Sequence, residues 1–69
     1  MSDSVYKVIE LVGTSSQSWE HAAAAAVERA GQSLRDLRVA EVISQDVLIE
    51  NGRVKAFRTK LNVSFKFES

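Results

Sequence analysis

The C-terminal stretch RVAEVISQDVLIENGRVKAFRTKLNVSFKFE, residues 38–68, decides the fold. At its centre, Asn51-Gly52 is the strongest short hairpin signal in the sequence, because both residues of a tight hairpin turn must accept a positive φ. The runs on either side are rich in β-branched and aromatic residues, which favour strands. The stretch therefore predicts two long antiparallel strands, residues 38–50 and 53–68.

The last of these strands alternates between apolar and polar positions. The odd positions are Phe57, Thr59, Leu61, Val63, Phe65 and Phe67, and the even positions are Ala56, Arg58, Lys60, Asn62, Ser64 and Lys66. A period of two is typical of a strand with one buried face. We expect the odd face to pack on a helix and the even face to look away from it.

The N-terminal half predicts a strand followed by a helix. Residues 1–4 predict a disordered tail, and residues 5–12 (VYKVIELV) predict a first strand, which the run 13–18 breaks. Ser18 is the expected N-cap of a helix from Trp19 to Leu37. Gly31 costs this helix about 1 kcal/mol relative to Ala, which indicates a close contact there. Apolar or small residues recur along the helix at helical spacing, at Trp19, Ala22, Ala23, Ala26, Val27, Ala30, Leu34 and Leu37.

The predicted fold class is α+β: one domain over residues 1–69, in the order β-α-β-β, with a three-stranded antiparallel sheet packed on one helix. A chain of 69 residues forms a core that rarely supplies more than about 3–5 kcal/mol. It has no cysteine for disulfides and a single histidine. One short helix also leaves the ends of the hairpin and the sheet edges uncovered. We therefore expect the protein to be stable only as an oligomer.

Composition excludes several function classes. Nine basic residues balance nine acidic ones, which argues against nucleic-acid binding. No apolar run approaches the ~20 residues that span a bilayer, and the first residues do not resemble a signal peptide, so a cytoplasmic location is expected. No nucleotide-binding or nucleophile-elbow motif is present, so no catalytic residues and no enzyme activity are predicted.

Four segments resemble the dodecin family: VYKVIELVGTS (5–15), the alanine-rich helix, AGQSLRDLRVAEV (30–42) and LNVSFKFE (61–68). The resemblance covers nearly the whole chain, in the family's order and at its length. It implies the β-α-β-β fold and a hollow homo-dodecamer of cubic symmetry. Many members of the family store or sequester flavins.

The resemblance also implies a degenerate flavin site. Val39 falls on the family's flavin-stacking tryptophan, Arg58 on its flavin-reading glutamine, and Asp46 on an arginine that contacts phosphate, whereas Lys66 keeps a basic residue. A valine loses the stacking energy of roughly 0.5–1.5 kcal/mol, and an arginine offers no acceptor to a ring N–H. Because Asp46 would also repel a phosphate, flavin binding is expected to be weak or absent.

The chain is more similar to a subset of the family, with Ser-Trp-Glu opening the helix, for which calcium binding is proposed. Asp46 and Glu50 are the candidate ligands, since Ca²⁺ prefers oxygen donors. They are four residues apart, roughly 13 Å along a strand, so a site would need a second subunit, a carbonyl or waters. The period of two places Glu41 on the opposite face. The alternative is that these carboxylates are simply solvated.

Three further features each have two interpretations. Trp19 either lines a ligand pocket or anchors the core or an interface. His21 is either a metal ligand or a surface residue, and the basic residues Arg58, Lys60 and Lys66 either bind an anion or pair with acidic neighbours across strands. Two functions remain: a non-enzymatic shell that binds or stores a small ligand or ion, and a structural or partner-binding assembly without one. Residual flavin binding is a further alternative.

Overall fold

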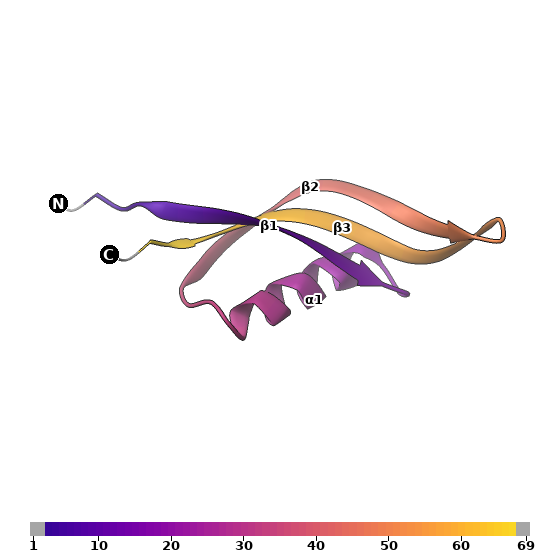
Figure 1. Cartoon of the computed structure of the whole chain (residues 1–69), viewed down its shortest axis with the longest axis horizontal. Coiled ribbons are helices and arrows are strands. Elements are labelled where there is room, and N and C mark those ends of the chain that lie inside the picture. The colour runs from indigo at the N-terminus through magenta and orange to yellow at the C-terminus, as the bar shows by residue number, and fades with distance from the viewer. Residues whose placement is uncertain (1–2, 68–69) are drawn as a thin grey trace.

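The computed structural model describes residues 3–67 and confirms the predicted β-α-β-β fold. Its elements are β1 (Tyr6–Ser15), α1 (Trp19–Gly31), β2 (Leu37–Glu50) and β3 (Arg53–Lys66). All pairings are antiparallel and the strand order is β1-β3-β2, so the last strand is the central one (Figure 1). Residues 1–2 of the predicted tail and Glu68 of the predicted last strand lie outside the described residues.

The core lies between α1 and one face of the sheet (Figure 1). Its buried apolar residues among those described are Ala22, Ala26, Leu61 and Val63. Thr59 is also buried, and its Oγ1 donates a hydrogen bond to the Trp19 carbonyl at 2.9 Å. The odd positions of β3 therefore face the helix, as predicted. Phe67 is the exception, since it follows the end of β3 and its side chain is 52% exposed.

The sequence predicted that the first strand breaks at Gly13, but β1 continues to Ser15. Gly13 is buried and pairs with Thr59 of β3. A Cβ at position 13 would collide with the carbonyl oxygen of Ala22 and would lie 3.0 Å from the Cβ of Ala26. Glycine here is therefore what allows α1 to approach β1. The close contact expected at Gly31 is at Gly13 instead, because the nearest atom to a Cβ at Gly31 is 3.7 Å away.

The helix is shorter than predicted. Ser18 is its N-cap, as expected, and its hydroxyl accepts a hydrogen bond from the His21 N–H at 3.0 Å. The helix ends at Gly31 rather than at Leu37, and Asp36, with φ 59°, redirects the chain into β2. Leu37 still packs against the core, but from the first position of β2. Leu37 therefore matched the helical spacing only by chance: it belongs to β2, which packs against the same core as α1.

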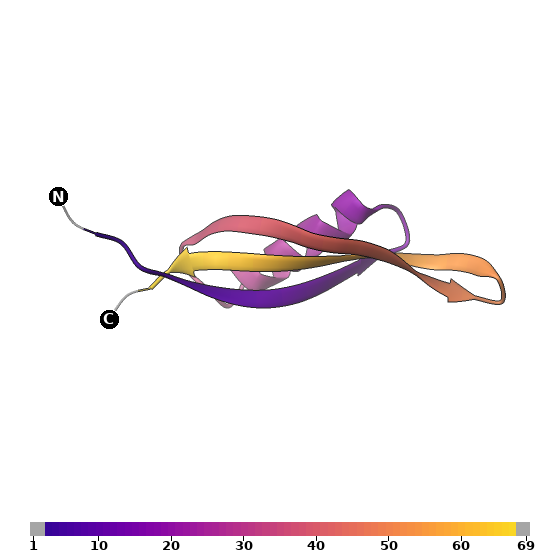
Figure 2. The same cartoon turned by 90° about the horizontal axis from the view of Figure 1, so that it is seen from above.

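The predicted hairpin turn is present, with φ 53° at Asn51 and 72° at Gly52. The pairing of β1 with β3 stops at Ser15–Phe57, whereas β2 and β3 continue to Glu50–Arg53. Residues 48–56 thus project beyond β1 and α1 as a two-stranded ribbon, here named the hairpin arm (Figure 2). The expected overhang is confirmed. Within residues 3–67, no helix is long and apolar enough to cross a membrane.

Candidate functional site

The face of the sheet opposite α1 carries the residues that the sequence singled out, and we name it the outer face. The register of β3 defines it, because the even positions of β3 point away from the buried Thr59, Leu61 and Val63. Across the three strands its rows are Val8–Ser64–Val39, Glu10–Asn62–Glu41, Val12–Lys60–Ser44 and Thr14–Arg58–Asp46.

Asp46 and Arg58 form a two-pronged ion pair on this face. They are direct cross-strand partners, with Arg58 Nε donating to Asp46 Oδ1 at 2.6 Å and Nη2 to Oδ2 at 2.7 Å. The hydrogen bond from Arg58, and then its charge, lower the pKa of Asp46, and the same hydrogen bond raises the pKa of Arg58. Each carboxylate oxygen therefore already accepts one hydrogen bond, and a cation at Asp46 would have to share these oxygens with the guanidinium or displace it.

Trp19 joins the start of α1 to the segment of β2 that contains Asp46. Its indole N–H donates to the Asp46 carbonyl at 3.0 Å, and its ring meets Phe57 edge-on with centroids 5.1 Å apart. Together with the bond from Thr59 to the Trp19 carbonyl, these contacts tie the helix to both long strands. The structure supports the interpretation of Trp19 as an anchor. It also shows that this carbonyl of Asp46 already has a donor.

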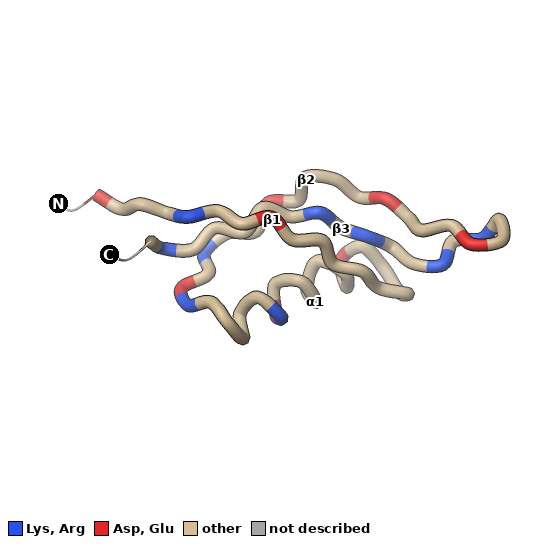
Figure 3. Tube along the Cα trace, in the orientation of Figure 1, with Lys and Arg blue, Asp and Glu red and all other residues tan. Residues whose placement is uncertain are grey.

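Two further ion pairs join neighbouring residues of the sheet, each through a single lysine nitrogen. Lys55 Nζ lies 3.1 Å from Glu50 Oε2, and Lys60 Nζ lies 3.7 Å from Glu10 Oε1. Figure 3 shows basic residues along β3 beside acidic residues on β2. For Arg58 and Lys60, cross-strand pairing is thus what the structure shows. These pairs are exposed, and such pairs contribute little stability, about 0–1 kcal/mol each.

Glu41 and Asp46 lie on the same face, which corrects the prediction that they lie on opposite faces. The register shifts by one residue between Val42 and Ser44, so Ile43 is an extra residue in β2. Such a bulge reverses the alternation beyond it. Glu41 is opposite Asn62 and Asp46 is opposite Arg58, four residues apart along β3 and roughly 13 Å distant.

Among residues 3–67, no three His, Cys, Asp or Glu side chains come together in a group that could hold a metal ion. Asp46 and Glu50 each contact a basic residue instead. The cation site predicted at these two residues therefore stays a prediction that needs groups from outside one subunit. His21 is exposed, and its Nδ1 lies 3.3 Å from the hydroxyl of Ser15.

The residues that the sequence analysis assigned to a degenerate flavin site do not converge within one chain. Val39 is 62% exposed and lies opposite Ser64, and Lys66 is two residues further along β3. The pair Asp46–Arg58 lies six residues from Ser64 along β3, roughly 20 Å away. A single small ligand cannot touch both ends of this face in one chain. The sequence analysis offered pairing of Arg58 with an acidic neighbour across strands as one interpretation, but it did not identify Asp46 as the partner.

One helix packed on a three-stranded antiparallel sheet, in the chain order β-α-β-β and with a projecting hairpin, defines a small α+β domain. The dodecin family model matches residues 5–68. The chain belongs to the dodecin family.

Two curated relatives match at high coverage. The chain is 56% identical over 63 residues to calcium dodecin of Mycobacterium tuberculosis. This alignment covers 91% of this chain and 89% of the relative. It is 42% identical over 64 residues to a dodecin of Thermus thermophilus, covering 93% of each chain.

Solved structures agree with this assignment. A dodecin from Streptomyces coelicolor superposes with a TM-score of 0.93 at 39% identity and covers 100% of this chain and 99% of its own. The calcium-chelating antigen calcium dodecin from Mycobacterium tuberculosis, described with a novel calcium-binding site, superposes with a TM-score of 0.84 at 53% identity. That match covers 93% of this chain and 91% of the solved one.

Proposed function

We propose that the protein is a non-enzymatic subunit of a hollow homo-dodecamer that binds a small ligand, with a divalent cation, Ca²⁺, favoured over a flavin. The observation that carries the proposal is the shape of the subunit, which is too open for a free monomer. The alternative is a structural or partner-binding assembly with no small-molecule ligand. A cytoplasmic location stays a prediction of the sequence.

The subunit exposes more surface than a free protein of its mass. Its accessible surface is 5346 Å², whereas a monomer of this mass exposes roughly 4,300 Å². Its radius of gyration is 14.3 Å, against roughly 11 Å for a compact chain of this length. The excess of roughly 1,000 Å² compares with the ~800 Å² that a standard interface buries on each partner. Burial against other copies would remove this excess.

The outer face is poorly suited to a flavin. Val39 offers no flat ring for stacking, and Arg58 is engaged by Asp46 on both carboxylate oxygens. A flavin phosphate would approach a carboxylate at Asp46 rather than a base. Each feature raises the free energy of a flavin complex relative to one built on tryptophan and glutamine.

Calcium is favoured because a relative 56% identical over nearly the whole chain is named calcium dodecin. On this chain the outer face carries three carboxylates: Glu10 and Glu41 share one row, and Asp46 lies two rows further along, beyond the row of Lys60. Calcium accepts six to eight oxygen ligands in a loose geometry. Copies that meet through this face would supply the ligands that one subunit lacks.

The test combines mass and ligand binding. Light scattering after size exclusion should give a dodecamer, and calorimetric titration of chelator-treated protein with CaCl₂ should show uptake that Asp46→Ala weakens. Titration of riboflavin fluorescence should show weak quenching, which the double change Val39→Trp with Arg58→Gln strengthens. A folded 7.6 kDa monomer at micromolar concentration contradicts the assembly. Identical calcium uptake by wild type and Asp46→Ala contradicts the site, and no uptake by either favours the structural alternative.

A further inference from the structure

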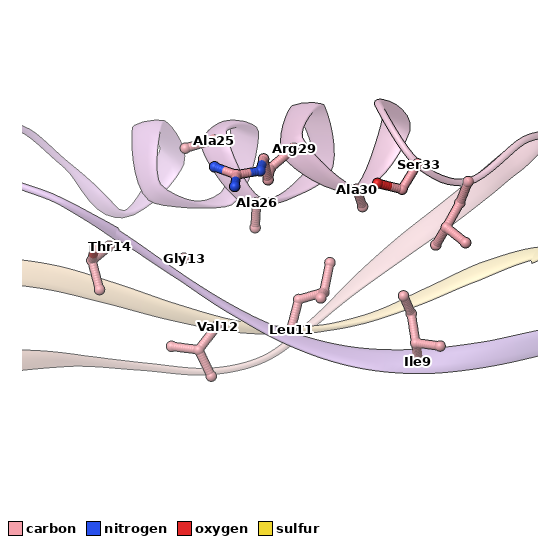
Figure 4. A pocket seen from close by; sticks show the side chains of 11 residues that line it. Ile9, Leu11, Val12, Gly13, Thr14, Ala25, Ala26, Arg29, Ala30 and Ser33 are labelled. Atoms are coloured by element: carbon pink, nitrogen blue, oxygen red, sulfur yellow. The ribbon is translucent and has the colours of Figure 1, made fainter.

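An open apolar groove of about 580 Å³ runs between β1 and α1 (Figure 4). Ile9, Leu11 and Gly13 line it on the strand side, and Ala25 and Ala30 line it on the helix side. The small side chains of α1 leave the groove wide. β1 is an edge strand, so the groove borders a backbone edge without a partner strand in this subunit.

The hairpin arm carries apolar side chains of its own. Ile49 is 69% exposed, Val54 is 54% exposed and Leu48 is 40% exposed. Ile49 and Val54 are cross-strand partners, so they form one apolar pair near the turn. A two-stranded hairpin without a covering layer is marginally stable in water. The arm therefore needs a partner that covers this pair.

We propose that the hairpin arm of one subunit lies in the β1–α1 groove of a neighbouring copy. The inference rests on the self-association proposed above and names the two surfaces that meet. The arm is short enough to fit within the groove: it spans three cross-strand rows, from Leu48–Ala56 to Glu50–Arg53, or roughly 10 Å. The groove follows β1 from Ile9 to Thr14, six residues, or roughly 20 Å.

Two further observations favour a second copy as the occupant. Each chain carries both the arm and the groove, so the contact is heterologous and successive copies can continue it until a ring closes. The charges also match: Arg29 lies on the groove and Glu50 lies at the tip of the arm. Glu50 contacts Lys55 through Oε2, and its other oxygen can accept a hydrogen bond from a guanidinium.

Cysteine cross-linking tests the contact directly, because the chain has no native cysteine. Ile49→Cys is combined with Ala25→Cys and, separately, with Ser33→Cys, which lie at different points along the groove. After mild oxidation, at least one pair should give covalent dimers and longer chains on a non-reducing gel. The control pairs Ile49→Cys with Glu28→Cys, an exposed helix position outside the groove lining, and should give none. Ile49→Cys alone should also stay monomeric on the gel, and a disulfide-linked dimer there would indicate tip-to-tip contact and overturn the proposal.

Light scattering on Ile49→Asp gives a second readout. A charge on the arm's apolar pair should at least halve the mass of the assembly. The matched change Val5→Asp, at an exposed valine outside the arm and groove, should leave the mass unchanged. If the wild type is an oligomer, Ile49→Asp has the same mass, and neither groove cysteine forms a cross-link, this contact is overturned but the proposed shell is not. A wild-type protein that is monomeric overturns both.

Discussion

At position 13 a missing side chain sets the distance between helix and sheet. A Cβ there would occupy the place of the Ala22 carbonyl oxygen and lie 3.0 Å from the Cβ of Ala26. Both obstacles are parts of α1 that cannot rotate away, since one is backbone and the other is a methyl group on a buried residue. Adding one carbon at this point must push the helix off the core.

Gly13→Ala is therefore expected to lower the free energy of unfolding by about 1–3 kcal/mol, the usual cost of overpacking. Chemical denaturation followed by circular dichroism measures it. Gly31→Ala is the matched control, because a Cβ there meets only ordinary contact at 3.7 Å; Gly31 is the last residue of α1, so alanine should gain less than the roughly 0.5–1 kcal/mol expected in the middle of a helix. Equal midpoints for the two variants would contradict the packing argument.

The Asp46–Arg58 pair makes stability depend on pH in the acid range. Because Arg58 lowers the pKa of Asp46 below its ordinary value of 3.8, the unfolded chain binds a proton at higher pH than the folded one. The stabilising contribution is complete above that ordinary value and is lost as pH falls through the lowered folded pKa. Acid should therefore weaken the fold in this window.

Urea midpoints measured from about pH 6 to about pH 2 should fall less steeply for Arg58→Gln than for wild type. Lys60→Gln, which removes a neighbouring charge but leaves the two-pronged bond, should keep most of the wild-type slope. The effect is modest because both side chains are 40–51% exposed. Identical slopes for wild type and Arg58→Gln would show that this pair is not linked to folding.

At the scale of elements, the turn of the hairpin arm requires a positive φ at both of its residues. Gly52 has φ 72°, and a Cβ there would meet nothing within 4 Å. Any cost of a side chain at this position is therefore conformational and not steric crowding. Asn51, with φ 53°, tolerates the same region because of its short polar side chain.

Gly52→Val should destabilise the arm by about 1–2 kcal/mol, since a β-branched residue is strained at positive φ. Thermal unfolding monitored by circular dichroism measures the loss. The control Asn51→Gly keeps positive φ accessible and should be nearly neutral. A Gly52→Val variant as stable as wild type would mean that the turn adopts another conformation at little cost.

The elements that the sequence predicted well are those fixed by local chemistry. The Asn51-Gly52 turn, the alternation of β3 and the Ser18 cap each depend on residues adjacent in the chain. The errors lie where two elements meet. Gly13 was interpreted as a strand breaker because the group that requires a glycine there, the carbonyl of Ala22, belongs to α1 and cannot be recognised from the neighbouring sequence.

The same distinction applies to the candidate site. The sequence identified Asp46 and Arg58 as changed positions, but their pairing depends on the register of β2 with β3. That register shifts between Leu48 and Ile49, which makes Arg58 the partner of Asp46, and shifts again at the extra residue Ile43; alternation alone reveals neither shift. For this reason Glu41 was assigned to the wrong face.

At the scale of the whole molecule, the subunit is a long ribbon, 55 Å by 20 Å by 15 Å. Its described buried apolar core consists of only four residues: Ala22, Ala26, Leu61 and Val63. Two alanines contribute little of this burial, because the hydrophobic free energy follows the apolar area removed from water, at about 25 cal/mol per Å². Partly buried residues such as Leu11 and Leu37 add to this core, but exposed apolar side chains such as Val39 and Ile49 stabilise the fold only if another copy covers them.

Stability should therefore depend on protein concentration. If unfolding of a dodecamer releases twelve unfolded chains, mass action makes a hundredfold dilution cost about 2.5 kcal/mol per subunit. At the roughly 1–3 kcal/mol per M that small proteins show in urea, the midpoint should fall by about 1–2.5 M. Circular dichroism and light scattering on the same samples should report the same transition, since folding and assembly are coupled. A midpoint that stays constant over this dilution would mean that the isolated subunit folds on its own, and that its uncovered groove and arm are stable in water.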